Sequence, residues 1–310
     1  MNNSTIMISN KRLHVEMFGT KDNPAVLYLH GGPGESCYDF TYHQAERLSE
    51  DFFVIAIDQR GVCRSEMIRE AEDFGLMDLV EDCEALRIEL GIERWSLIGH
   101  SFGGFLSLLY ASTYPTSIEK MIVECPTFDF ELTSRNLLRK TAQLLKKYGK
   151  EDASALCLEA AASGRSSKEI TEMYGKLSDE LGEHRMEIYR FNHDHPTDYY
   201  AAYTEEQWEE FYDRSEVHYK RLMDEGEIFT SLLPKLKEVN QPMLLMLGKH
   251  DAVTCDVQIE AFHTDVQNGE TILFENSGHT PHYEEPEKFK EVVCAFLSKR
   301  EESINKTFAL

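Results

Sequence analysis

The sequence of 310 residues predicts an α/β protein with a mostly parallel central β-sheet, flanked by helices and interrupted by a helical cap insertion. The first observation is an alternation, in which short runs of β-branched and aliphatic residues are separated by helical patterns. The second is that these runs are almost continuously apolar, as burial on both faces of a parallel sheet requires. The third is a single break at 127–239, where amphipathic patterns rich in Glu, Lys, Tyr and Leu replace the strands.

The predicted strands and helices follow one another along the chain in a definite order. The segment 13–18 is expected to form an antiparallel edge strand. The expected parallel strands span 25–30, 52–58, 95–100, 120–125, 243–248 and 271–275, and the clearest helical patterns span 78–90, 102–114 and 285–300. Pro286 suits the first turn of the last helix. We therefore expect a core of residues 1–126 and 240–310, with residues 127–239 forming a cap inserted between core strands.

The composition indicates the compartment and excludes several classes of partner. Lys and Arg total 32 against 55 for Asp and Glu, so the net charge is −23, and such a surface repels nucleic-acid phosphates and anionic lipid headgroups. Residues 1–10 lack the apolar core of a signal peptide, and no apolar run approaches the roughly 18 residues that span a bilayer. The seven cysteines are odd in number and widely spaced, which is typical of a reducing compartment. We expect a cytoplasmic protein without nucleic-acid or membrane partners.

A Gly-x-Ser-x-Gly motif at 99–104 stands between an apolar strand pattern and a helical pattern. A strand-to-helix turn this sharp needs glycine near the serine, because a Cβ would clash there, and it projects the hydroxyl above the sheet. The following helix directs backbone N–H groups and the positive end of its dipole to the same place. Ser101 is therefore the predicted nucleophile, and the adjacent His100 is expected to line the substrate pocket.

A second glycine-rich segment, His30-Gly31-Gly32-Pro33-Gly34, follows the first predicted parallel strand. Acyl transfer needs two N–H donors where the tetrahedral oxyanion forms, and glycines let the main chain approach that point. We predict that the N–H groups of Gly32 and Phe102 form this oxyanion hole, with Gly31 as an alternative donor and tentative substrate contact. No Lys-Ser or Lys-Thr pair follows, so a phosphate-binding loop is not indicated.

Asp251 and His279 each follow a predicted strand, and the order Ser, Asp, His is the one found in the α/β-hydrolase fold. Serine is too weakly acidic to attack at neutral pH, so His279 is predicted to take its proton and Asp251 to orient the imidazole. His282 is an alternative base and Glu124 an alternative acid. Because such a triad supplies its own base, we expect neither a metal nor an organic cofactor.

Three segments together resemble the proline iminopeptidase (prolyl aminopeptidase) family of α/β-hydrolases. These segments are the HGGPG sequence at 30–34, the DQRG sequence at 58–61 and the GHSFGG sequence at 99–104. The SGHTPH sequence at 277–282 is similar to the wider superfamily. The resemblance covers nearly the whole chain except the cap.

This resemblance implies an enzyme that releases an N-terminal residue, preferably proline, from short peptides through an acyl-enzyme on Ser101. It also implies that Asp58 and Arg60 shape the turn beside the pocket. Two positions differ from the family pattern: Cys63 stands where a glycine is common, and Ala252 stands where some relatives carry a glutamate.

An aminopeptidase must also meet the protonated substrate amine with carboxylates, since a desolvated unpaired cation is costly. The acidic and aromatic part of the cap offers Trp208, Glu209, Phe211 and Glu216 as tentative substrate contacts. The main alternative is a carboxylesterase or lactonase for small uncharged esters, with an apolar pocket built from Phe102 and the two cap aromatics. A non-catalytic ligand receptor is a third hypothesis, which the complete triad disfavours. In each case the expected partner is a small molecule or short peptide, and the sequence does not indicate an oligomeric state.

Overall fold

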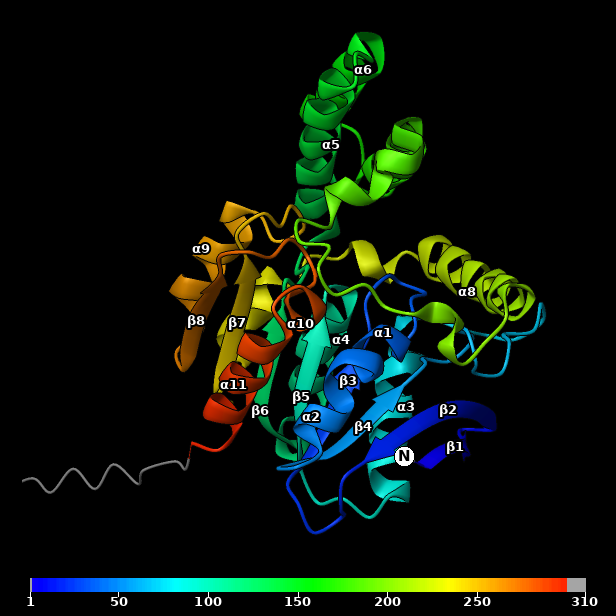
Figure 1. Ribbon diagram of the computed structural model, residues 1–310, viewed down its shortest axis with the longest axis vertical. Helices are drawn as coiled ribbons and strands as arrows, with labels where there is room; N and C mark the ends of the chain where they lie inside the picture. Colours follow the sequence, from blue (N-terminus) through cyan, green and yellow to red (C-terminus); the bar gives the residue numbers. More distant parts are fainter. Residues whose placement is uncertain (1, 300–310) are drawn as a thin grey trace, which may run out of the picture.

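In the computed structural model, which describes residues 2–299, eight strands form one sheet in the order β1-β2-β4-β3-β5-β6-β7-β8 (Figure 1). Strand β2 pairs antiparallel with both β1 and β4, and every later pairing in that order is parallel. The strands are β1 (Asn2–Ile8), β2 (Lys11–Phe18), β3 (Ala25–Leu29), β4 (Phe53–Ile57), β5 (Trp95–His100), β6 (Ile118–Glu124), β7 (Met243–Gly248) and β8 (Gly269–Phe274). The predicted mostly parallel sheet is confirmed.

The edge strand β1 is the one strand that the sequence does not predict, because its Asn, Ser and Thr residues form no long apolar run. It pairs with β2 along its whole length. Ser9 and Asn10 connect the two strands with φ values of 47° and 64°. Two successive positive φ values are those of a type I′ hairpin turn, which suits the twist of the flanking strands. The predicted antiparallel strand therefore lies one place in from the edge.

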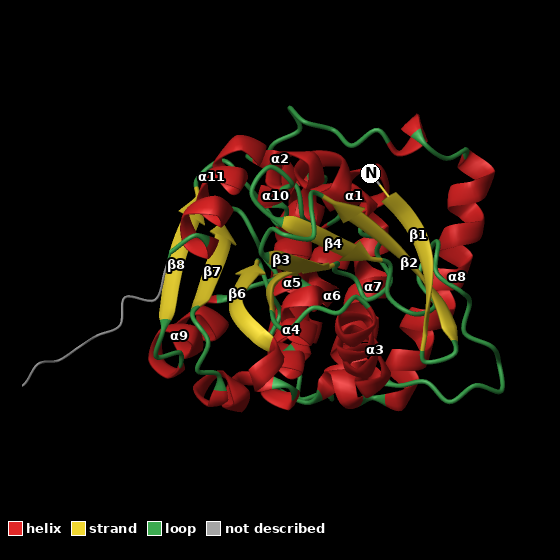
Figure 2. Ribbon diagram, turned by 90° about the horizontal axis from the view of Figure 1, so that it is seen from below, coloured by secondary structure: helices red, strands yellow, loops and turns green. Residues whose placement is uncertain are grey.

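Helices cover both faces of the sheet (Figure 2). Helices α3, α4 and α9 pack on one face in a cluster that includes Leu79 and Phe105, and α1, α2 and α11 pack on the other with Phe40 and Phe289. None of these or the other described helices has the length and apolar character needed to cross a membrane. The core helices are α1 (Tyr38–Phe40), α2 (Glu46–Leu48), α3 (Leu76–Glu89), α4 (Phe102–Thr113), α9 (Asp256–Asp265), α10 (Pro281–Glu284) and α11 (Pro286–Leu297).

A helical insertion lies between β6 and β7. Its helices are α5 (Phe130–Lys147), α6 (Glu151–Ala162), α7 (Ser167–Ser178) and α8 (Glu205–Glu225). Helices α5, α6 and α7 pack around a cluster that includes Leu138, Leu145 and Ile170 and that Ala252 and Val253 join from the loop after β7, and this group of helices projects from the sheet. Helix α8 lies apart from them (Figure 1) and ends at Gly226, whose φ of 89° is the left-handed conformation that glycine favours. The insertion therefore covers the carboxyl end of the sheet with two separate helical parts.

Candidate active site

Ser101 lies at the turn between β5 and α4. Its φ and ψ of 55° and −117° are strained for a residue with a side chain, and such strain persists only where the surroundings enforce it. Glycines make the tight packing possible: a Cβ on Gly99 would overlap the Gly103 carbonyl oxygen, and a Cβ on Gly103 would overlap the carbonyl oxygen of Leu29. The turn thus places Ser101 at the N-terminus of a 12-residue helix, at the mouth of a cavity that its side chain lines.

The predicted oxyanion loop lies directly beside Ser101. A Cβ built on Gly31 would stand 3.0 Å from the Cβ of Ser101, so a side chain at this position would press against the predicted nucleophile. His30 fixes the loop from behind. Its Nε2 accepts the N–H of Gln59 at 3.0 Å, so the neutral ring carries its proton on Nδ1 and donates it to the Gly31 carbonyl at 2.9 Å. Burial lowers the pKa of His30 to about 4, which keeps the ring neutral.

The contact between His30 and Gly31 bears on the predicted oxyanion hole. A trans peptide directs its C=O and the next N–H in opposite directions, so holding the Gly31 carbonyl also fixes the N–H of Gly32. Gly32 lines the cavity with a φ of 105°, and a Cβ there would collide with the backbone of Gly34. Phe102 supplies only its backbone near the site, because its ring is fully buried and packs against Phe105 and Phe130.

Asp251 and His279 lie side by side in the loops that follow β7 and β8. The Nδ1 of His279 is 2.9 Å from Asp251 Oδ1, and the N–H groups of Val253 and Thr254 donate to the two carboxylate oxygens at 3.0 and 2.9 Å. A carboxylate held in this way fixes the imidazole with Nε2 free to accept a proton. No hydrogen bond joins Ser101 to His279 within the described residues, although both line the same cavity. Contacts of this kind often shorten only when substrate binds.

The buried carboxylate of Glu284 holds the loop that carries the predicted base. It accepts the N–H of Gly278 at 3.0 Å and the N–H of Thr280 at 3.1 Å. It also accepts the N–H groups of Phe191 and Asn192, from the insertion, at 2.9 and 2.8 Å. One side chain therefore ties the core loop to the insertion. Sequence reasoning missed Glu284, which stands two residues beyond the SGHTPH sequence on which the superfamily resemblance was drawn.

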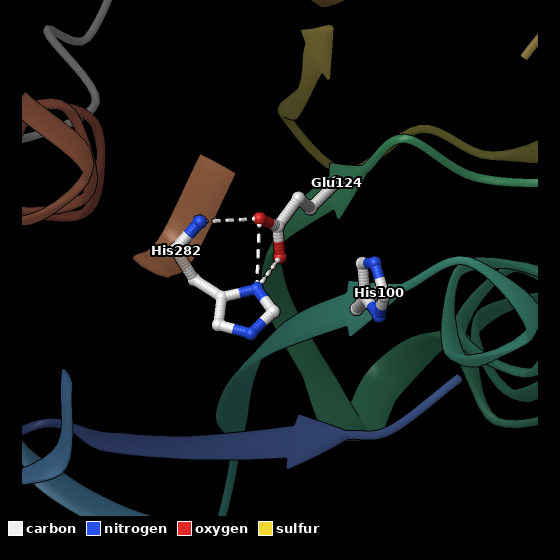
Figure 3. A group of neighbouring side chains, drawn as sticks. All are labelled: His100, Glu124 and His282. Atoms are coloured by element: carbon white, nitrogen blue, oxygen red, sulfur yellow. Dashed lines mark hydrogen bonds and ion pairs between the residues drawn. The ribbon is translucent and has the colours of Figure 1, made fainter. Parts of the chain in front are cut away.

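The alternative base and acid, His282 and Glu124, form a separate buried pair behind the site (Figure 3). Both Glu124 oxygens lie 3.0 Å from His282 Nδ1, and one accepts the His282 N–H at 2.7 Å. His282 Nε2 lies 3.5 Å from an oxygen of Asp39. Burial alone would lower the pKa of His282, but the two carboxylates raise it to about 10. The imidazole is thus a fixed cation, which is unsuited to act as a general base.

Figure 3 also shows His100 beside this pair, and the nitrogen and oxygen atoms of the three residues lie within 4.8 Å of one another. One ring nitrogen of each histidine is already engaged. His282 Nδ1 is paired with Glu124, and His100 Nε2 lies 3.0 Å from the carbonyl oxygen of His279. These three residues therefore support the His279 loop through hydrogen bonds, and their geometry does not require a metal ion.

A cavity of about 390 Å³ opens above Ser101, between the sheet and the insertion. Two carboxylates line it, Glu35 and Asp39, together with two arginines, Arg185 and Arg190. The lining also includes aromatic and aliphatic side chains, among them Tyr28, Phe130, Leu137, Tyr174, Tyr189, Tyr199, Tyr212, Tyr219, Val253 and Tyr283. Such a space matches the dimensions of small-molecule sites, and it carries both signs of charge.

With the site described, the comparisons place the chain among known proteins. A family model for the alpha/beta hydrolase fold matches residues 24–286. The chain belongs to this family. A proline iminopeptidase of Saccharolobus solfataricus is 25% identical to this α/β-hydrolase over 286 residues, which are 89% of this chain and 86% of the relative.

Solved structures agree on the fold of this α/β-hydrolase. The proline iminopeptidase of Mycobacterium smegmatis has a TM-score of 0.67 at 20% identity, covering 96% of this chain and 97% of that one. An esterase from Exiguobacterium antarcticum has a TM-score of 0.64 at 18% identity, covering 96% and 100%. The predicted fold and the resemblance to proline iminopeptidases, as distant homologues, are thereby confirmed.

Four tentative substrate contacts in the cap of this α/β-hydrolase do not line the cavity: Trp208, Glu209, Phe211 and Glu216. Trp208 is buried against the core instead, with Tyr38 and Cys63, and its indole N–H donates to the Tyr199 carbonyl at 2.6 Å. The two glutamates are exposed on α8. The helix is rotated so that Tyr212 and Tyr219 face the cavity. Of the tentative contacts, Gly31 and His100 do line it.

The turn that follows β4 is held by two buried ion pairs. Asp58 accepts hydrogen bonds from Ser36, from the Cys37 N–H and from Arg64, while Arg60 pairs with both oxygens of Asp82 at 2.8 and 2.5 Å. These bonds connect the DQRG segment to the residues just after the oxyanion loop. Cys63, in the same turn, is buried with a φ of 42°, and burial raises the pKa of its thiol.

Proposed function

We propose that this α/β-hydrolase is a serine aminopeptidase that releases the N-terminal residue, preferably proline, from short peptides. The observation that carries the proposal is the carboxylate of Glu35, which follows the oxyanion loop directly and projects into the cavity. It makes no hydrogen bond or ion pair within residues 2–299. A free carboxylate beside the nucleophile is what recognition of a substrate ammonium group requires.

The charge of Glu35 depends on its neighbours. Its carboxyl is accessible from the cavity yet surrounded by protein, and burial together with the nearby Asp39 raises its pKa. Asp39 differs because it already pairs with His282 and accepts a hydrogen bond from Thr197. Glu35 is therefore the available partner for an incoming cation, and the bound amine would in turn favour its ionised form.

The proposed reaction uses the residues described above in two half-reactions. Ser101 Oγ attacks the carbonyl of the first residue while His279 Nε2 takes its proton, and the N–H groups of Gly32 and Phe102 stabilise the oxyanion. The C–N bond then breaks, and His279 returns the proton to the departing amine. Water, activated by the same histidine, hydrolyses the ester on Ser101 and releases the first amino acid. Asp251 holds the imidazole throughout.

A test compares proline p-nitroanilide with p-nitrophenyl acetate, using Ser101→Ala as the blank. Both substrates report acyl transfer, but only the anilide carries a free amine. Glu35→Gln should lower kcat/KM for the anilide by about 10- to 100-fold, the value of a hydrogen bond to a charged group. The same change should alter ester turnover by no more than about twofold, as an uninvolved position would. Glu216→Gln, exposed on α8 outside the cavity, is the matched control.

The ester hydrolase remains the second candidate, because Phe130, Leu137 and Val253 give one part of the cavity an apolar wall. An uncharged acyl group could pack there without using Glu35. Ester turnover that Ser101→Ala abolishes, with no turnover of the anilide, would favour this function over the aminopeptidase.

A further inference from the structure

Arg190 is a cationic side chain on the cavity wall whose neighbours are tyrosines, Tyr199 and Tyr283. The neighbouring Arg185 lies 3.5 Å from Asp179, whereas no carboxylate among the described residues forms an ion pair with Arg190. The Nε of Arg190 is also buried without a hydrogen-bond acceptor. A buried, unsatisfied guanidinium donor costs free energy, and an acceptor on a bound ligand would remove that cost.

The backbone holds Arg190 in place from both sides. The preceding Tyr189 carbonyl accepts the N–H of His279 at 2.7 Å, and the following Phe191 N–H donates to Glu284 at 2.9 Å. The guanidinium lies over the ring of Tyr283, 5.2 Å from its centroid. Stacking on an aromatic face orients the plane of the guanidinium. The cation is thus positioned in advance, close to the predicted catalytic base.

The cavity therefore holds two charges of opposite sign, Glu35 and Arg190, neither of which forms an ion pair within residues 2–299. Glu35 and Arg190 are near enough for the guanidinium to act electrostatically on the carboxyl and partly offset the rise in its pKa. A planar guanidinium edge suits bidentate binding of a carboxylate. A ligand that satisfied both residues would carry an ammonium group at one end and a carboxylate at the other.

We propose that Arg190 binds the free C-terminal carboxylate of the substrate, so that the preferred substrates are dipeptides. This inference rests on the proposed function, since it takes the substrate amine to be at Glu35. The carboxylate then belongs to the departing amino acid, which leaves with the proton that His279 returns. Each further residue would move the carboxylate about 3.3–3.6 Å along an extended chain, away from a cation whose position is fixed.

Binding and turnover should be measured separately. In the Ser101→Ala protein, calorimetric titration with prolyl-alanine and with prolyl-alaninamide compares two ligands that differ in the terminal charge. The dipeptide should bind about 10- to 100-fold more tightly than the amide, as expected for a charge-assisted hydrogen bond. Adding Arg190→Met should abolish this preference, and Arg190→Lys should retain part of it. Arg185→Met, at the paired arginine of the same cavity, should leave the preference unchanged.

Equal affinity for the two ligands would overturn the inference. An Arg190→Met protein whose affinity falls equally for both ligands would also overturn it. The same holds for an Arg185→Met protein that no longer prefers the dipeptide to the amide. A thermal melt of each variant shows whether it is folded. Turnover of prolyl-alanine by the protein with Ser101 intact reports on the proposed function independently. An Arg190-dependent preference without turnover would refute the aminopeptidase and keep the carboxylate site.

Discussion

Replacing Glu124 by glutamine should destabilise the fold while leaving the catalytic chemistry in place. The glutamate is fully buried and accepts two bonds from His282, whose ring lies between Glu124 and Asp39. Removing one partner of a buried ion pair costs about 3–5 kcal/mol. For a chain of this size that corresponds to a fall of about 5–8 °C in Tm.

The matched substitution is Asp251→Asn. It should lower Tm by less than Glu124→Gln does, because the amide oxygen still accepts one of the two N–H groups that the Asp251 carboxylate accepts from Val253 and Thr254. It should lower kcat by about 10⁴-fold, since an amide no longer selects the productive tautomer of His279. Thermal melts and p-nitrophenyl ester turnover on both variants separate the two effects. A Glu124→Gln protein with unchanged Tm and a 10⁴-fold loss of kcat would show that the catalytic pair had been assigned to the wrong residues.

The same prediction has a pH dependence with a definite sign. Burial disfavours the charged ring, but Glu124 and Asp39 raise the pKa of His282 to about 10, above the value of about 6.5 in an unfolded chain. A raised pKa contributes stability that is fully present below pH 6.5 and is lost as pH rises through 10. The difference in unfolding free energy between the parent and Glu124→Gln should therefore be largest below pH 6.5 and shrink toward pH 10. A difference that grows over that range in denaturant titrations would contradict the charged state assigned to His282.

Three further changes test other parts of the site. Gly103→Ala should yield little folded protein on expression, because its Cβ would overlap the Leu29 carbonyl oxygen, whereas Gly164→Ala meets nothing within 4 Å and should melt like the parent. Glu284→Gln should lower both kcat and Tm, because an amide cannot accept all of the N–H groups that the carboxylate accepts. An unchanged kcat would show that other contacts hold the His279 loop. Because its pKa is raised, Glu35 should lose its charge at a higher pH than an ordinary carboxyl. The acid limb of kcat/KM for proline p-nitroanilide should thus shift to lower pH in Glu35→Gln, with no shift for the ester.

Much of the fold could be predicted from the sequence because parallel strands and the turns between them leave local signals. The apolar runs mark the buried strands, and the glycine at 99 is needed by contacts with Gly103 and Ser107 inside a single strand-turn-helix unit. Strand β1 leaves no such signal. Its pairing depends on the turn at Ser9 and Asn10 and on the neighbouring strand, and its own polar residues do not favour a strand.

The substrate cavity was harder to predict because its lining depends on how the insertion sits on the core. Helix α8 carries aromatic residues on more than one face, so periodicity does not distinguish Tyr212, which lines the cavity, from Trp208, which packs on the core. Glu35 and Arg190 are brought together from positions 155 apart in sequence, by contacts that no local pattern encodes. By contrast, the proximity of Asp251 and His279 follows from strand order, since β7 and β8 are neighbours in the sheet.

The bond from the His279 N–H to the Tyr189 carbonyl joins the insertion to the core at the backbone of the predicted base. Glu284 acts at the same junction, because it accepts N–H groups from Gly278 and Thr280 on the core side and from Phe191 and Asn192 on the insertion side. A displacement of the insertion at this edge would therefore strain contacts on both sides of His279. The position of the insertion and the position of the imidazole are thus coupled in this fold.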